Sequence, residues 1–259
     1  SSISRAMATD RHCPHHRPHH CSLAPDLAMA TPLPSLRLVG RNLSPFVRRV
    51  AVSMNVLGLP YLQEELIPLG EGKDRLRAAN PVTRVPLLMV GDESAPDEPE
   101  TLIDSATILD ALDEMVGPDA ALIPPSGADR RAVLKLTAVG VGVAEKAVTG
   151  MYEWRLRSED KWHQPVADAA AVQARDGLRW LDAQLGEQRF LFGDRLTQAD
   201  ITAIVAYEYL RIANPELHAD LNTPALAAAA AAAETTPPFS SAHPGVTYDK
   251  PAWAIANPL

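Results

Sequence analysis

The chain has 259 residues, of which 46% are hydrophobic, and a formal net charge of -8 at pH 7. This length is enough for one large or two modest domains, each with its own core. An acidic chain without clustered Lys and Arg is not expected to bind nucleic acid through a broad basic surface. No apolar run approaches the roughly 20 residues that cross a bilayer. Small molecules and proteins are therefore the expected partners, and no nucleic acid or membrane is expected among them.

Residues 1–34 are predicted to be a disordered leader, because prolines are dense there and no hydrophobic period is present. Those prolines also interrupt any apolar run, so a signal peptide is not expected. Metal binding is one interpretation of the cysteines and histidines in this segment, but the fixed spacing of zinc sites is missing and no metal is expected. Since both cysteines lie here, the folded part has neither a disulfide framework nor a thiol nucleophile, which suits a reducing cytoplasm. The residues concerned are Cys13, Cys21, His12, His15, His16, His19 and His20.

Residues 35–118 are predicted to form a small α/β domain. A short apolar strand, Leu36–Val39, precedes an amphipathic helix that begins at Pro45. Ser44 is a preferred N-cap residue, and Pro45 suits the first helical position. Unpaired N–H groups and the positive end of the helix dipole favour an anion, and a thiolate is such an anion. The Ser44 hydroxyl is therefore predicted to lie where a sulfur could be held.

Three further strands and one helix complete this domain. The segment between Ile67 and Val85 is interpreted as a linker, and the last helix starts at Asp104 or Ser105 and stops before Gly117. The strands are predicted at Tyr61–Ile67, Val85–Val90 and Thr101–Ile103, with an acidic turn, Gly91–Glu100, between the last two.

After a linker at residues 119–128, residues 129–243 are predicted to be helical. Helices are expected from about Ala128 to Arg157, from Val166 to Leu185 and from near Thr197. Gly140, Gly142 and Gly150 weaken the first of these by about 1 kcal/mol each relative to Ala, and either close packing or a ligand would explain them. Residues 244–259 form a tail that covers a site, docks on a partner subunit or stays disordered.

Two further motifs favour ligand contacts. Pro86 stands at the start of an apolar strand, and if the Val85-Pro86 bond is cis, Val85 presents its backbone to an extended peptide; an ordinary trans proline is the alternative. Asp104 and Ser105 begin a helix, where a ligand carboxylate could take the Ser105 hydroxyl and Asp104 could accept from an ammonium. A simple helix cap is the alternative for that pair.

In this order along the chain, the Ser-Pro-Phe helix start, the Asn-Pro-Val-x-x-Val-Pro strand entry and the Asp-Ser cap resemble the glutathione S-transferase superfamily. The resemblance covers roughly Leu36 to His243 and is strongest to serine-type, cytosolic members, the tau-like and bacterial ones. Thr197 and Asp200 are similar to the capping box of the family's helical domain, with Leu196 and Ile201 as its hydrophobic staple.

This resemblance implies the fold class and the function. The fold is α/β plus all-α: an N-terminal thioredoxin-like βαβαββα domain, followed by an all-helical C-terminal domain. The function is conjugation of glutathione to a hydrophobic electrophile, in detoxification, by a cytoplasmic homodimer. Glutathione is then a co-substrate, and no metal is required.

Site residues carry over where the motifs match. Ser44 corresponds to the catalytic hydroxyl, which would donate to the sulfur of glutathione and favour its thiolate. The remaining glutathione contacts are Phe46, Arg84, Val85, Pro86, Asp104 and Ser105, with Arg84 at the glycyl end. The electrophile would meet Met151, Tyr152 and Arg155, although core packing is an equal interpretation of each.

Other functions on the same fold remain open. These are glutathione-dependent isomerisation, dehalogenation or peroxide reduction, and non-catalytic binding of glutathione or hydrophobic ligands. The thiol-oxidoreductase branch is disfavoured, because Ser44 stands where that branch has a nucleophilic cysteine and serine cannot form a mixed disulfide. The isomerase branch is disfavoured too, because its Ser-Ser-Cys run is missing around Ser44.

Overall fold

The structure is a computed structural model, and it describes residues 34–68, 72–91 and 99–245. These residues belong to one compact unit, Leu33–Leu259. The predicted leader with its cysteines and histidines, most of the acidic turn and the tail from residue 246 lie outside the described residues.

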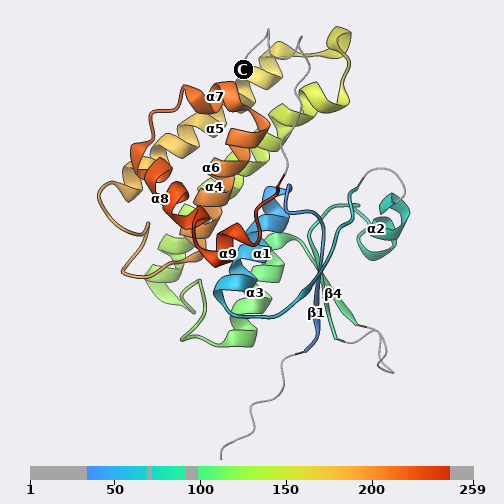
Figure 1. The fold of residues 1–259 in the computed structure, drawn as a ribbon, viewed down its shortest axis with the longest axis vertical. Coiled ribbons are helices and arrows are strands. Elements are labelled where there is room, and N and C mark those ends of the chain that lie inside the picture. The colour runs from blue at the N-terminus through green and yellow to red at the C-terminus, as the bar shows by residue number, and fades with distance from the viewer. Residues whose placement is uncertain (1–33, 69–71, 92–98, 246–259) are drawn as a thin grey trace, which may run out of the picture. The chain divides into compact units, whose positions relative to one another are not determined.

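A four-stranded mixed sheet forms the centre of the N-terminal half (Figure 1). Its strands are β1 (Leu36–Val39), β2 (Leu62–Glu64), β3 (Leu87–Val90) and β4 (Glu100–Ile103), in the spatial order β2-β1-β3-β4. β1 pairs with β2 in parallel, whereas β1 with β3 and β3 with β4 are antiparallel. The hairpin predicted for the last two strands is confirmed.

Helices cover both faces of this sheet. α1 (Pro45–Val56) and α3 (Ser105–Val116) lie on one side, and α2 (Lys73–Ala79) lies on the other (Figure 1). Because side chains alternate along a strand, Leu38 and Leu88 join the main core, whereas Val39 and Leu87 face α2 and pack with its Leu76.

α2 corrects the interpretation of residues 68–84 as a linker. Of its residues, Leu76 alone is buried, so no apolar period marked this short helix in the sequence. The thioredoxin-like order βαβαββα, which the resemblance implied, is the one observed.

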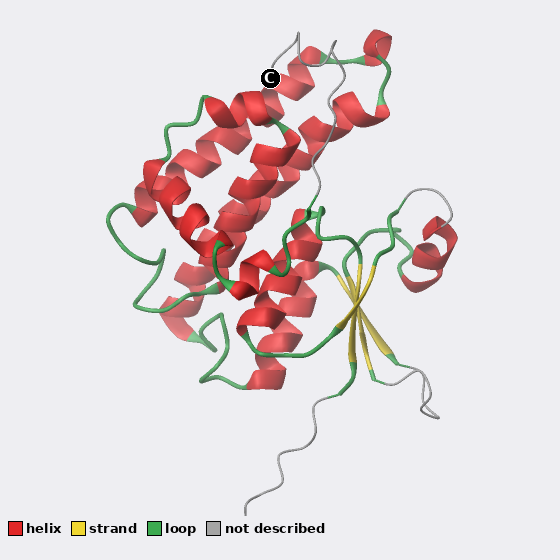
Figure 2. Ribbon diagram, in the orientation of Figure 1, coloured by secondary structure: helices red, strands yellow, loops and turns green. Residues whose placement is uncertain are grey.

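The C-terminal half contains helices and no strand among its described residues (Figure 2). Its first helix is the long α4, followed by a short 3-10 turn at Glu159–Lys161. The fold class predicted from the sequence is therefore confirmed. The α-helices are α4 (Gly127–Leu156), α5 (Gln164–Leu185), α6 (Gln198–Ala213), α7 (Pro215–Ala219), α8 (Pro224–Glu234) and α9 (Pro237–Ser240).

α6 is buried along nearly its whole length, and its start is fixed by the predicted capping box. The Thr197 N–H donates to Asp200 Oδ2 at 2.8 Å, and the Leu191 N–H donates to Asp200 Oδ1 at 2.6 Å. Burial raises the pKa of Asp200 above its ordinary value, although these hydrogen bonds oppose the rise. Asp200 thus ties the loop before α6 to the helix.

α1 connects the two halves through buried polar contacts. Arg48 is 3% exposed and donates from Nη2 to both carboxylate oxygens of Glu234, at 2.6 and 2.7 Å, and from Nε to the Ala242 carbonyl at 3.1 Å. The Ser53 hydroxyl lies 2.9 Å from Gln198 Oε1 at the start of α6. These contacts fix α1, and with it Ser44, against the helical half.

Candidate functional site

A cavity of about 180 Å³ lies where the start of α1, the loop before β3 and the start of α3 meet. Most of the residues predicted to contact glutathione line it together: Phe46, Arg84, Val85, Pro86, Asp104 and Ser105. Ser44 is half-buried and lies two residues before Phe46, but it is not itself part of the lining. The structure therefore brings three separate sequence motifs to one place.

Ser44 is the N-cap of α1, as predicted. Its Oγ accepts from the Val47 N–H at 3.5 Å, a distance at the long end of hydrogen bonding. A serine hydroxyl carries one donor and two acceptor sites, so accepting this bond leaves its proton free to donate. The turn before α1 also needs glycine: Gly40 has φ +134°, and a Cβ there would come within 2.5 Å of Val47 Cγ2.

The loop from Asn80 to Pro86 forms one wall, and its Val85-Pro86 peptide bond is cis. Asn80 is 4% exposed and holds this loop from inside. Its Nδ2 donates to the Arg84 carbonyl at 3.0 Å, and its Oδ1 accepts from the Val82 N–H at 3.0 Å. Asn80 was part of a motif in the sequence, but its role in shaping the loop could be found only from these contacts.

The start of α3 forms the opposite wall. Asp104 is the N-cap, and its Oδ1 accepts from the Ala106 N–H at 2.8 Å, while the Ser105 side chain is buried. Within the described ranges, Thr83 and Asp104 are the non-glycine residues with positive φ, at 56° and 71°. Such backbone strain tends to gather at functional sites, and here both residues lie in the segments that line the cavity.

Two cations border the cavity. The Arg84 guanidinium lies 5.9 Å from the centre of the Phe46 ring, within the range of a cation-π contact. Arg49 is 3% exposed, and its Nε has no hydrogen-bond partner among the described residues. Burial lowers the pKa of Arg49 to about 10, and the Asp104 carboxylate partly opposes that shift. Arg49 was not predicted as a site residue, because the apolar spacing of this helix gave no sign that one of its arginines would line the cavity.

The residues predicted to meet the electrophile do not line this cavity. Met151 is buried, whereas Tyr152 and Arg155 are exposed toward the end of α4. α4 instead contributes Val141 and Glu145 to the cavity wall. The structure thus places the predicted electrophile residues outside the cavity that gathers the predicted glutathione residues, further along α4 than Glu145.

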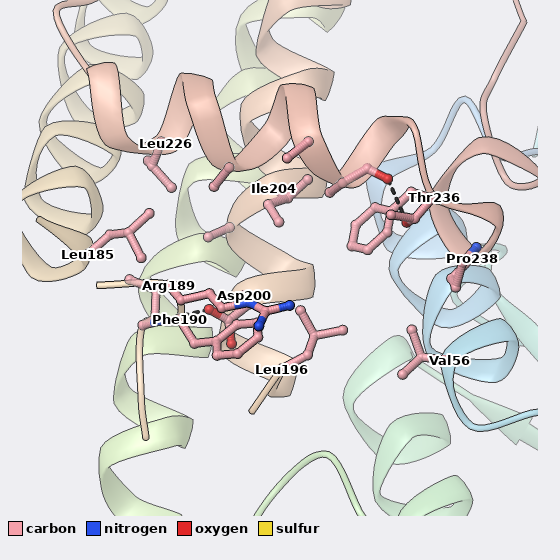
Figure 3. Close-up of a pocket in the computed structure, with 16 residues that line it drawn as sticks. Val56, Leu185, Arg189, Phe190, Leu196, Asp200, Ile204, Leu226, Thr236 and Pro238 are labelled. Atoms are coloured by element: carbon pink, nitrogen blue, oxygen red, sulfur yellow. Dashed lines mark hydrogen bonds between the residues drawn. The ribbon is translucent and has the colours of Figure 1, made fainter. Parts of the chain in front are cut away.

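A larger cavity, of about 340 Å³, lies in the helical half and contains none of the predicted site residues (Figure 3). It is bounded by α6, α8, α9, the segment 185–191 and the end of α1. We call it the α8 cavity.

Among the described residues, neither cavity holds a group of His, Cys, Asp and Glu side chains arranged to bind a metal. Within the same residues, no helix combines the length and apolar character needed to cross a bilayer.

The fold and site together define a class: a thioredoxin-like domain with a cis-proline loop beside a helix start, joined to a helical domain. Family comparison agrees with this class. Residues 38–119 match the glutathione S-transferase N-terminal domain, and residues 164–247 match the glutathione S-transferase C-terminal domain. The chain belongs to the glutathione S-transferase superfamily. Comparison with curated protein sequences gives no match.

Solved structures of this superfamily are similar over most of the chain. A glutathione S-transferase from Methylobacterium radiotolerans, in complex with glutathione sulfonate, is 25% identical, with a TM-score of 0.73 over 84% of this chain and 98% of its own. One from Methylobacillus flagellatus with bound glutathione is 26% identical, with a TM-score of 0.72 over 81% and 100%. A family member from Pseudomonas fluorescens with bound glutathione is 28% identical, with a TM-score of 0.69 over 82% and 100%.

Proposed function

We propose that this protein is a glutathione S-transferase enzyme that joins the thiolate of glutathione to a hydrophobic organic electrophile. The observation that supports this most is the cavity of about 180 Å³, which gathers the cis-proline loop and the Asp104-Ser105 helix start around one space. Solved relatives of similar fold contain bound glutathione. The serine-type, tau-like or bacterial subgroup remains part of the proposal.

Each part of glutathione has a partner of suitable chemistry. The backbone of Val85 pairs with the cysteinyl residue, as a strand edge pairs with an extended peptide. Ser105 and the start of α3 take the γ-glutamyl carboxylate, and Asp104 takes the ammonium, since one of its carboxylate oxygens caps Ala106 and the other can accept. Arg84, beside the Phe46 ring, attracts the glycyl carboxylate.

Ser44 acts on the sulfur. A free thiol has a pKa near 8.5, so most of it is protonated at neutral pH, whereas attack on an electrophile requires the thiolate. The hydroxyl proton of Ser44, which its cap bond leaves free, donates to the thiolate, and the start of α1 adds the favourable end of the helix dipole. Because Ser44 is not a cysteine, conjugation is favoured over disulfide exchange.

The electrophile lies between the cavity and the end of α4. Met151 is six residues beyond Glu145, which places it about 9 Å further along the helix axis at 1.5 Å per residue. Met151, Tyr152 and Arg155 therefore lie toward the far end of an extended electrophile, with the exposed Tyr152 and Arg155 in contact with it. A homodimer, a cytoplasmic location and a role in detoxification complete the proposal.

A glutathione-affinity column followed by an assay panel tests this function. We expect retention on the column and turnover with aromatic halides. Retention without turnover favours a non-catalytic binder. Turnover only with isomerase, dehalogenase or peroxidase substrates favours those activities. If the parent protein is not retained, all of these functions are excluded. Ser105→Ala is expected to weaken retention, because it removes the hydroxyl proposed to bind the γ-glutamyl carboxylate. The cap residue Asp104 stays in place, so the start of α3 is kept. Thr107→Ala, an exposed change on the same helix outside the cavity lining, is the matched control.

A further inference from the structure

The α8 cavity is a half-open pocket of about 340 Å³. An engineered apolar cavity of roughly 150 Å³ stays dry and binds benzene. The α8 cavity has more than twice that volume, so it can hold a longer hydrocarbon chain.

The sequence of α8 explains the space. The helix reads Pro-Ala-Leu followed by seven alanines and Glu234, and its Leu226, Ala229, Ala232 and Ala233 line the cavity. Facing them are Ala203 and Ile204 of α6. An alanine side chain is a single methyl group, so this face of α8 leaves an apolar slot that larger side chains would fill.

One end of this slot carries a positive charge. Figure 3 places Arg189 beside Phe190 and Asp200, across the cavity from Leu226. The Arg189 guanidinium lies 5.0 Å from the centre of the Phe190 ring, and among the described residues it forms no ion pair. The two carboxylate oxygens of Asp200 accept from Leu191 and Thr197, so Asp200 is held in the capping box rather than paired with Arg189.

We infer that the α8 cavity binds an amphipathic aliphatic carboxylate, with its hydrocarbon chain between α6 and α8 and its carboxylate on Arg189. The apolar walls remove the chain from water, and the guanidinium supplies a charge-assisted, bidentate partner for the head group. This site lies apart from the glutathione cavity, since the two share no lining residue. It does not depend on the proposed transferase activity.

Titration calorimetry with octanoate tests the inference on the full chain, with octan-1-ol as the uncharged probe of the same length. We expect octanoate to bind at one site with the same affinity in the presence and absence of saturating glutathione. Arg189→Gln is expected to weaken octanoate at least about tenfold, the effect of losing one charge-assisted hydrogen bond, and to leave octanol unchanged. Arg179→Gln, an exposed arginine of α5 outside the cavity, is the matched control.

A second pair of variants fills the slot. Ala229→Phe is expected to abolish binding of both probes, whereas Ala231→Phe, on the exposed side of the same helix, leaves both unchanged. Four results would overturn the inference: no octanoate binding to the parent protein, unchanged octanoate affinity in Arg189→Gln, equal binding to Ala229→Phe and its control, or displacement of octanoate by glutathione. Arg189→Gln alters a surface side chain, so the test stands even if Ala229→Phe fails to fold.

Discussion

Replacing Ser44 by Ala separates its two roles, as a helix cap and as a donor to sulfur. The cap bond to the Val47 N–H is long, at 3.5 Å, so its loss lies near the lower end of N-cap effects. We expect a cost of about 0.5 kcal/mol in the free energy of unfolding. For a chain of this size that corresponds to a fall of about 1 to 2 °C in melting temperature. The variant therefore stays folded while its chemistry is measured.

The effect on catalysis is expected to be much larger. A hydrogen bond to a charged group contributes about 1.5 to 3 kcal/mol, and each 1.4 kcal/mol is a factor of about ten. kcat/KM for glutathione with an aromatic halide is therefore expected to fall about 10-fold to 150-fold. Because the thiolate loses its donor, the bound thiol pKa rises by one to two units, and the pH-rate profile shifts to higher pH by about that amount.

Calorimetry and steady-state kinetics together decide this case. At a pH below the pKa of the bound thiol, where glutathione binds as the thiol, its Kd is expected to change less than about twofold, because the cysteinyl and γ-glutamyl contacts lie on other elements. Ser126→Ala is the control, since Ser126 is the N-cap of α4 and its side chain forms no cap hydrogen bond. Equal kcat/KM for parent and Ser44→Ala, or a profile that does not move with pH, would refute the role of Ser44 as the sulfur donor.

Three further predictions concern stability. Glu234→Ala leaves Arg48 buried without its carboxylate partner and is expected to cost about 3 kcal/mol in chemical denaturation; a loss under about 1 kcal/mol, the range of exposed pairs, would contradict this. Gly142→Ala is expected to stabilise the fold by about 1 kcal/mol, because a Cβ there meets nothing within 4 Å. Gly140→Ala is expected to destabilise it, because its Cβ would come within 3.3 Å of the Ala203 backbone nitrogen; equal melting temperatures for the two variants would refute the packing argument. Burial raises the pKa of Asp113, so the folded state holds that proton more tightly than the unfolded state. The difference in free energy of unfolding between the parent protein and Asp113→Asn is expected to favour the parent most below the unfolded pKa of about 3.9 and to decline as pH rises through the folded pKa. A difference that stays constant with pH would contradict the shift.

The local features of this fold were predictable because they depend on neighbouring residues. Ser44 and Pro45 mark the start of α1, and Thr197 with Asp200 marks the start of α6, since caps act within one turn. The strands β1 and β3 appeared as short apolar runs. The sequence alone therefore determined the order of most elements and three of the motifs that meet at the candidate site.

The tertiary structure decided what depends on residues far apart in the chain. α2 could not be detected, because one buried side chain, Leu76, gives no period. Gly140 and Gly142 are equivalent in sequence, but only Gly140 packs against the α6 backbone. Arg48 and Arg49 are adjacent arginines, yet one meets Glu234 and the other lines the cavity. Their roles differ because neighbouring residues on a helix point about 100° apart, and what each direction meets is set by the packing of the two halves.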